Sequence, residues 1–276
     1  MRILHINSAA IIILLFCVSS CSTDYRNKTE EQLEHEKVVK YKIKSIKQFK
    51  NTFQFGIEQK EQLSRLENFD ENGFKQKEII YSDGNIESNI NFEYDKNGNL
   101  INANSSTPKN SFIYKITRNY YENNLIKELY YYHADGTYKY RNIATYDKSG
   151  RMTELKYFYP DGLKSINKFV YSGHKKTEDA EYAPTGEFRY KWVYKYDNKD
   201  NLIEAIQYYP NNIINSKITY EYDQGRLLLK QINYFGESIQ NISSFTYNEK
   251  KLLSSKTEMA SGGMISAKYT YQYEFF

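Results

Sequence analysis

The chain has 276 residues, a formal net charge of +4 and a mean hydropathy of −0.77. Both cysteines lie in the first 21 residues, so the rest of the chain can hold no disulfide, cysteine nucleophile or cysteine metal site. The mild positive charge forms no basic stripe of the kind that nucleic-acid binding requires, and we expect no nucleic-acid partner.

Residues 1–20 have the pattern of a secretory signal peptide, with a short basic start and an apolar run over residues 11–18 that is too short to span a bilayer as a helix. The run ends at Val-Ser-Ser-Cys, which resembles a bacterial lipobox. The resemblance implies that Cys21 becomes the first mature residue and carries a diacylglycerol, which would hold the protein at the cell envelope. Ser22 after the cysteine favours the outer membrane, by analogy with enteric bacteria. The alternative is cleavage near Ser20 that leaves a free thiol at Cys21.

Residues 21–37 are polar and nearly free of apolar anchors, so we expect a flexible tether with at most a helical turn around Glu30–Glu36. From residue 38 the pattern changes. Val39, Tyr41 and Ile43 alternate with lysines, and this period of two predicts a strand. We therefore assign residues 38–276 to a single repeat domain.

A short group, aromatic residue followed by Asp and then Gly or Asn, recurs along this domain at steps of 25 to 27 residues. A fixed period over about 200 residues indicates a repeat architecture. The first aromatic residues of the groups are Phe69, Tyr94, Tyr121, Tyr146, Tyr171, Tyr196, Tyr222 and Tyr247.

A second turn signal follows each group, as in Tyr159-Pro-Asp-Gly, and the strand that leads to each anchor alternates aromatic and polar residues. Pro, Asp and Gly favour tight turns, and their spacing leaves strands of about 8 or 9 residues. The pattern predicts an all-β fold: a long antiparallel meander of repeated β-hairpins of about 25 residues. So many strands exceed what an open twisted sheet usually holds, so we expect it to curl around its aromatic face into a partly closed shell. An open single-layer sheet is the alternative.

The repeat over residues 60–276 resembles the YD repeat of the Rhs family of bacterial surface and toxin proteins. The resemblance is specific at Tyr94, Tyr146, Tyr196 and Tyr222 with their Asp partners, and weak at the other anchors. It implies a continuous sheet of hairpins that winds into a shell, in an envelope setting. Eight or nine units are too few to enclose a toxin domain, so toxin delivery is not implied.

No residue set indicates a catalytic site, a cofactor or a metal centre. His35, His133 and His174 share no ligand spacing and are interpreted as solvated residues. The group that begins at Asp95 is similar to the start of a calcium loop but lacks its closing Glu, so we interpret it as a turn.

Rigid, amphipathic tyrosines beside the second turns are the candidate binding residues, since tyrosine gives contact area at low entropic cost. They are Tyr132, Tyr159, Tyr182 and Tyr209. We expect a lipid-anchored, non-enzymatic envelope protein that binds or scaffolds a protein or glycan partner. The alternatives are an envelope hydrolase acting on polysaccharide, and an immunity or accessory partner of an Rhs-type toxin.

Overall fold

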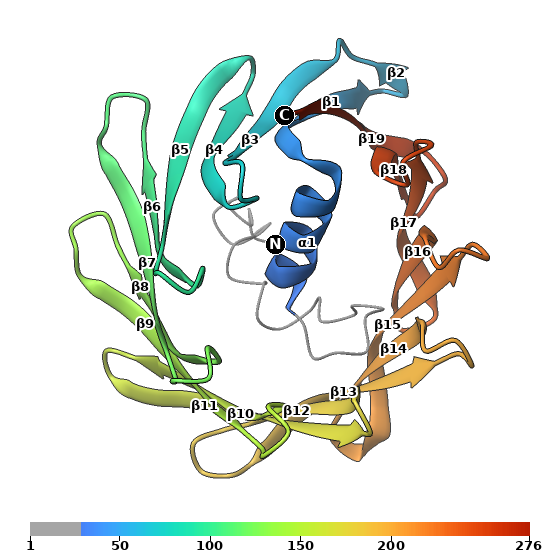
Figure 1. Cartoon of the computed structure of the whole chain (residues 1–276). Helices are drawn as coiled ribbons and strands as arrows, with labels where there is room; N and C mark the ends of the chain where they lie inside the picture. The colour runs from blue at the N-terminus through green and yellow to red at the C-terminus, as the bar shows by residue number, and fades with distance from the viewer. Residues whose placement is uncertain (1–28) are drawn as a thin grey trace.

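The computed structural model describes residues 29–276, and the signal sequence and Cys21 lie outside the described residues. The chain forms one helix followed by a meander of strands, which confirms the predicted all-β class (Figure 1). The elements are α1 (Glu30–Tyr41), β1 (Ile43–Gln54), β2 (Ile57–Glu58), β3 (Gln62–Phe69), β4 (Lys75–Ser82), β5 (Asn85–Tyr94), β6 (Leu100–Ser106), β7 (Phe112–Tyr120), β8 (Ile126–Tyr132), β9 (Tyr138–Tyr146), β10 (Met152–Tyr159), β11 (Gly162–Ser172), β12 (Lys175–Tyr182), β13 (Phe188–Tyr196), β14 (Leu202–Tyr209), η3 (Pro210–Asn212), β15 (Ile213–Tyr222), β16 (Leu228–Phe235), β17 (Ser238–Tyr247), β18 (Leu253–Ala260) and β19 (Ile265–Phe275).

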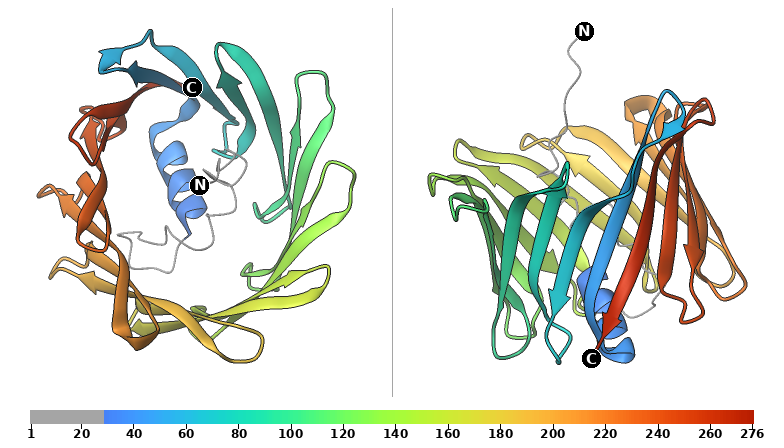
Figure 2. Two further views of the ribbon diagram at one scale, coloured as in Figure 1. Left: turned by 180° about the vertical axis from the view of Figure 1, so that it is seen from behind. Right: turned by 90° about the horizontal axis from the view of Figure 1, so that it is seen from above.

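Neighbouring strands from β3 to β19 pair antiparallel in chain order, and β1 pairs with both β3 and β19. In the closing pair, Ile46 lies opposite Tyr273 and Gln48 lies opposite Tyr271. The short β2 pairs only with the end of β1. The sheet is therefore closed into a barrel of 18 strands. The left view of Figure 2 looks along the barrel and shows the ring of strands around α1. The predicted curling into a shell is confirmed. The alternative of an open single-layer sheet is wrong, because the pairing of β1 with β19 leaves the sheet without unpaired edges.

The barrel has two rims. The turns after the aromatic–Asp groups form one, which we call the anchor rim. The hairpin turns β1–β2, β4–β5, β6–β7, β8–β9, β10–β11, β12–β13, β14–β15, β16–β17 and β18–β19 form the other, the tip rim.

Helix α1 lies inside the barrel (Figure 1). It begins at a capping box in which Thr29 and Gln32 exchange side-chain-to-backbone hydrogen bonds, and it ends at Lys42 with a φ of 53°. The predicted tether is therefore wrong over residues 30–37, and the predicted strand is wrong over residues 38–41. The alternation of Val39 and Tyr41 with lysines was too short to distinguish strand from helix, and the polar helix is stabilised by the charged inner wall described below.

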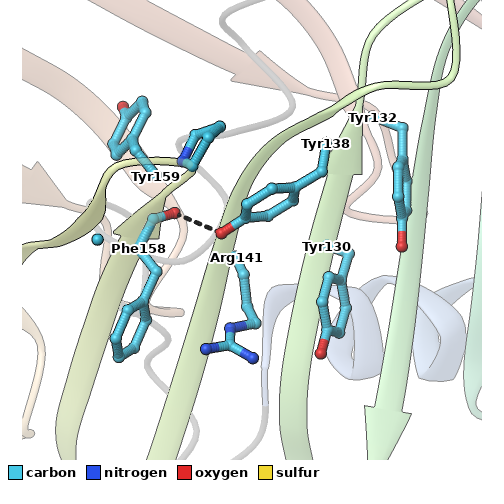
Figure 3. Close-up of a pocket in the computed structure, with 8 residues that line it drawn as sticks. Tyr130, Tyr132, Tyr138, Arg141, Phe158 and Tyr159 are labelled. Carbon is cyan, nitrogen blue, oxygen red and sulfur yellow. Dashed lines mark hydrogen bonds between the residues drawn. The ribbon is translucent and has the colours of Figure 1, made fainter.

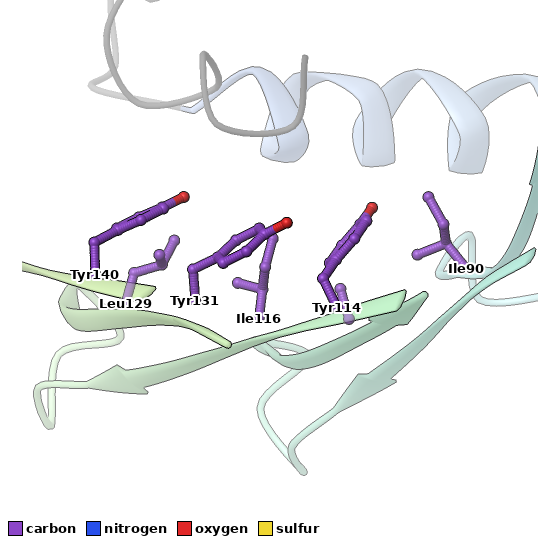
Figure 4. Close-up of a cluster of buried hydrophobic side chains, with 7 residues drawn as sticks. Ile90, Tyr114, Ile116, Leu129, Tyr131 and Tyr140 are labelled. Carbon is purple, nitrogen blue, oxygen red and sulfur yellow. The ribbon is translucent and has the colours of Figure 1, made fainter. Parts of the chain in front are cut away.

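The aromatic stripe of the repeat faces the lumen. Figure 4 shows aromatic and aliphatic side chains on the sheet face turned toward α1, where the rings of Tyr114, Tyr131 and Tyr140 stack in sequence. Their centroids are 5.4 Å and 5.2 Å apart. Cross-strand aromatic pairs contribute about 0.2–1 kcal/mol each, so a continuous ladder can stabilise a barrel that has no thick aliphatic core. Glu93 and Lys195, which are polar residues that alternate with the aromatic stripe, are exposed.

The anchor tyrosines have a structural role that the sequence pattern did not reveal. The hydroxyl of Tyr146 donates a hydrogen bond of 2.9 Å to the backbone carbonyl of Ile126, which lies 20 residues earlier. The same bond is made by Tyr94, Tyr120, Tyr171, Tyr196, Tyr247 and Tyr273. The third anchor is therefore Tyr120, not Tyr121, because Tyr120 is the residue that pairs with Ile126 and makes the repeated bond.

Where an Asp follows the anchor, its carboxylate closes the turn. The Asp95 carboxylate accepts hydrogen bonds from the backbone N–H groups of Asn97 and Asn99, at 2.8 Å and 2.9 Å. Asp147 and Asp197 repeat this geometry. The prediction that these groups are turns is confirmed.

Candidate binding site on the outer face

An aromatic hollow lies on the outer face of β8, β9, β10 and β11, near the tip rim (Figure 3). Side chains alternate along a strand, so residues next to the inward-facing Tyr131 and Tyr140 point out. Tyr130 lies opposite Arg141, and a register shift after Tyr131 then brings Tyr132 opposite Tyr138. The shift keeps both rings on the outer face.

The hollow has a volume of about 410 Å³, which lies within the range of small-ligand sites. Tyr138 donates a hydrogen bond from its hydroxyl to the carbonyl of Phe158 at 3.0 Å, which fixes its ring across the β9–β10 pair (Figure 3). The residues that line the hollow are Tyr130, Tyr132, Tyr138, Arg141, Phe158, Tyr159, Pro160 and Gly162.

Arg141 supplies the positive charge of the hollow. Its guanidinium carbon lies 4.8 Å from the ring centroid of Phe158 and 6.0 Å from that of Tyr130. Nε of Arg141 is buried and has no hydrogen-bond partner, and no carboxylate within residues 29–276 pairs with this guanidinium. Such a cation, held between aromatic faces, is available to an anionic or hydrogen-bond-accepting ligand.

A second, smaller hollow of about 250 Å³ adjoins the first and shares Tyr132 with it. It is lined by Phe112, Lys115, Thr117 and Gly136 as well. The ring of Tyr132 therefore separates two neighbouring subsites, each of which contains a cation and at least one aromatic ring.

The four predicted binding tyrosines lie at four successive hairpins of the tip rim. The structure brings Tyr132 and Tyr159 together in the larger hollow. Tyr182 instead packs against Phe188, with ring centroids 5.9 Å apart, and Tyr209 is an exposed residue at the end of β14.

Sequence reasoning missed Tyr130, Tyr138, Arg141 and Phe158, which build most of the hollow. The Tyr130-Tyr131-Tyr132 run was a usable signal, because alternation must place its first and last rings on one face.

A group of charged residues on the inner wall binds α1. Lys75 Nζ lies 2.6 Å from Glu67 and 3.2 Å from Glu34 of the helix. Burial opposes the charged form of Lys75, but the carboxylates of Glu67, Glu34 and Glu78 outweigh it and raise the pKa of Lys75. Burial raises the pKa of Glu78, against the lowering effect of Arg65. These contacts hold the helix in the lumen.

Two further contacts complete the docking of α1. Arg118 pairs with Glu31 at 2.7 Å. The ring of His35 stacks on Phe74 with centroids 4.6 Å apart, and its Nδ1 lies 3.1 Å from the carbonyl oxygen of Gly73. The interpretation of His35 as a solvated histidine is therefore wrong, because the helix carries it against the wall. Across residues 29–276 no cluster of His, Cys, Asp or Glu has the arrangement of a metal site.

Over the described residues, none of the helices has the length and apolar character needed to cross a membrane. No protein-family model and no curated protein matches the chain.

Similarity to solved structures is weak. A porin-like protein from Bacteroides uniformis has 10% identity and a TM-score of 0.48, over 85% of this chain and 97% of that one. A porin-like protein from Bacteroides vulgatus has 10% identity and a TM-score of 0.32, over 83% and 98%. The Tc holotoxin pore of Photorhabdus luminescens has 12% identity and a TM-score of 0.29, over 73% of this chain and 13% of that one. The neighbours thus include Rhs-related toxin chains, but only weakly, and no sequence family identifies the repeat.

Proposed function

We propose that this chain is a lipid-anchored protein of the bacterial cell envelope, and that it binds an acidic glycan in the outer aromatic hollow. The observation that carries the proposal is Arg141, whose buried Nε has no hydrogen-bond partner and whose guanidinium lies between the rings of Phe158 and Tyr130 in a hollow of about 410 Å³. The signal-like residues 1–20 and the lipobox-like sequence that ends at Cys21 support the envelope setting.

The chemistry of the hollow fits a sugar acid. The C–H face of a pyranose ring packs on an aromatic ring, and a guanidinium binds a carboxylate through two parallel hydrogen bonds. The neighbouring hollow beyond Tyr132, with Lys115, provides room for a second sugar unit. No acidic residue lines either hollow, and Glu128, which accepts a hydrogen bond of 3.4 Å from the Tyr130 hydroxyl, is the carboxylate that acts on Arg141.

Binding to a panel of uronic-acid-containing and neutral polysaccharides tests the proposal. We expect binding to the acidic members, and a 10- to 100-fold loss of affinity in Arg141→Gln, because a charge-assisted hydrogen bond contributes about 1.5–3 kcal/mol. Arg189→Gln is the matched control, since Arg189 is paired with Glu181 on another strand. Equal affinity of wild type and Arg141→Gln would exclude the hollow as the site.

The anchor has its own test. Cys21→Ala is expected to release the protein from the membrane fraction, since no other lipid attachment point is proposed. Retention of the variant in that fraction would show a second membrane contact, and absence of metabolically incorporated fatty acid from the wild-type chain would contradict the lipoprotein assignment.

A second candidate function is a polysaccharide hydrolase that uses the inner-wall carboxylates. It is favoured by the raised pKa of Glu78, which lies in one network with Glu67. Against this function, Lys75 contacts both Glu67 of the wall and Glu34 of α1, so the charged network holds the helix in the lumen. Polysaccharide turnover that is abolished in Glu78→Gln would favour the hydrolase. A toxin captured from envelope extract would favour the immunity or accessory role.

A further inference from the structure

The most exposed large hydrophobic side chains of the tip rim lie on one arc, whereas Ile86 and Phe112 elsewhere on the rim are 39% and 38% exposed. Large hydrophobic residues protrude from its hairpin turns, with exposed fractions between 60% and 95%: Phe55 (95%), Ile57 (68%), Ile213 (60%), Phe235 (63%) and Met264 (66%). They come from the turns β14–β15, β16–β17, β18–β19 and β1–β2, which are consecutive around the closed barrel.

The remaining hairpins of the same rim have polar tips. The corresponding turns carry Asp83, Asn110, Asp135, Asp161 and Thr185. These turns differ from those of the arc in the side chains that they carry at their tips. The apolar arc lies across the barrel from β8–β11, where the aromatic hollow opens (Figures 1 and 2).

The arc continues onto the outer face just below the tips. Ile214, Ile239 and Ile265 are exposed there, and each lies opposite an outward-facing residue of the neighbouring strand. Lys217 and Lys268 follow in the next layer of the same face, and Lys217 Nζ lies 4.3 Å from the ring centroid of Tyr234. Glu58 and Glu237 are the acidic residues at the tips themselves.

We propose that this arc, residues 55–57, 213–214, 235–239 and 264–265, inserts into the interfacial region of a lipid bilayer. Equivalent positions two strands apart are spaced by about 10 Å, so the tips are separate points and not the walls of a groove. Separate convex side chains match a fluid surface, which closes around each of them, whereas a protein partner would need a complementary socket for each. Apolar side chains of interfacial proteins bury about 5–10 Å into the headgroup boundary, with lysines just outside.

The chain that precedes the helix is long enough for this orientation. This step rests on the proposed function, in which Cys21 carries a lipid. Glu31 contacts Arg118, which lies six residues from Phe112 at the tip-rim end of β7, or roughly 20 Å along the strand. The eight residues from Cys21 to Thr29 can span up to about 28 Å. A lipid on Cys21 therefore reaches a membrane plane that lies against the tip rim.

Together the arc and the anchor orient the barrel. With the arc in the membrane, the hollow on β8–β11 lies across the barrel from the inserted tips.

Bromolipid quenching tests the proposal on the full chain. Trp192 is the only tryptophan, so Trp192→Phe gives a background in which Met264→Trp or Thr185→Trp is the single fluorophore. The chains are mixed with phosphatidylethanolamine–phosphatidylglycerol vesicles that contain brominated acyl chains, and vesicle flotation is measured in parallel. We expect a blue-shifted emission and at least twofold quenching for Met264→Trp, and neither for Thr185→Trp at the polar part of the rim.

Each outcome separates the arc from the anchor. Flotation with an unquenched Met264→Trp would overturn the arc and leave the anchor intact. Quenching of Met264→Trp that persists in Cys21→Ala would show that the arc contacts the bilayer without the lipid, and would support the arc. A blue shift that needs no vesicles and grows with protein concentration would show self-association through the arc, and would overturn the membrane proposal. A second set of variants places the single tryptophan at Ile213→Trp. Adding Phe235→Asp and Met264→Asp to this chain should abolish its quenching while the circular dichroism spectrum stays unchanged. Retained quenching would also overturn the proposal.

Discussion

Replacement of Lys75 by methionine tests whether the inner-wall charges stabilise the barrel as one network. Lys75 contacts Glu67 at 2.6 Å and Glu34 at 3.2 Å, and Glu78 lies in the same network. Methionine preserves most of the side-chain volume but leaves the carboxylates without their shared cation. Removing one partner of a buried ion pair lowers the free energy of unfolding by about 3–5 kcal/mol. Because Glu34 is partly exposed, its ion pair with Lys75 contributes only a small part of this loss.

The effect of Lys75→Met on the free energy of unfolding should also depend on pH. Burial already raises the pKa of Glu78 in the folded state, and loss of the Lys75 cation, which lowers that pKa, raises it further. The folded protein then binds more protons than the unfolded chain between the unfolded and the raised pKa values, so its stability increases as the pH falls through that window. The loss of unfolding free energy in Lys75→Met relative to wild type should therefore be largest near neutral pH and should become smaller toward pH 5.

Urea unfolding followed by circular dichroism at both pH values measures the deficit. Lys168→Met is the control, because Lys168 is exposed on the outer face and should change the unfolding free energy by less than about 0.5 kcal/mol. A loss below about 1 kcal/mol at neutral pH, or a deficit of constant size across the pH range, would refute the reasoning.

Two further substitutions test the repeat itself, with thermal unfolding as the measurement. Tyr146→Phe removes one hydroxyl of the repeated tyrosine–carbonyl bond and should cost about 0.5–1.5 kcal/mol; no loss would mean that water replaces the bond at no cost. Gly98→Ala should destabilise the barrel more than Gly136→Ala, because both glycines have a φ of 80° but a Cβ at Gly98 would lie 2.7 Å from the Phe74 ring, whereas Gly136 has open space around it. Equal losses for the two alanine variants would show that backbone strain outweighs the contact with Phe74.

Local chemistry determined the repeat. Tyr94 and Asp95 specify an anchor and its turn within one hairpin, since the carboxylate bonds to backbone groups only two and four residues away. Strand alternation likewise placed the aromatic ladder on one face. These features depend on near neighbours in the chain, so the period, the strand class and the curling of the sheet could be predicted from residues alone.

Tertiary structure decided the features that depend on distant partners. Closure required β1 to pair with β19, and the position of α1 required Arg118 and Lys75 on strands far along the chain from Glu31 and Glu34. No local pattern encodes such pairs, so the sequence of residues 30–37 by itself predicts a tether and not a helix.

The candidate site shows both contributions. Tyr132 and Tyr159 were predicted as binding residues from their turns, and the structure places them together in one hollow. Arg141 was missed, because its place between Tyr130 and Phe158 follows from the cross-strand register, and a single-residue shift in that register would turn its side chain to the other face. The sequence by itself determined which residues recur, and only the closed sheet decided which of them meet.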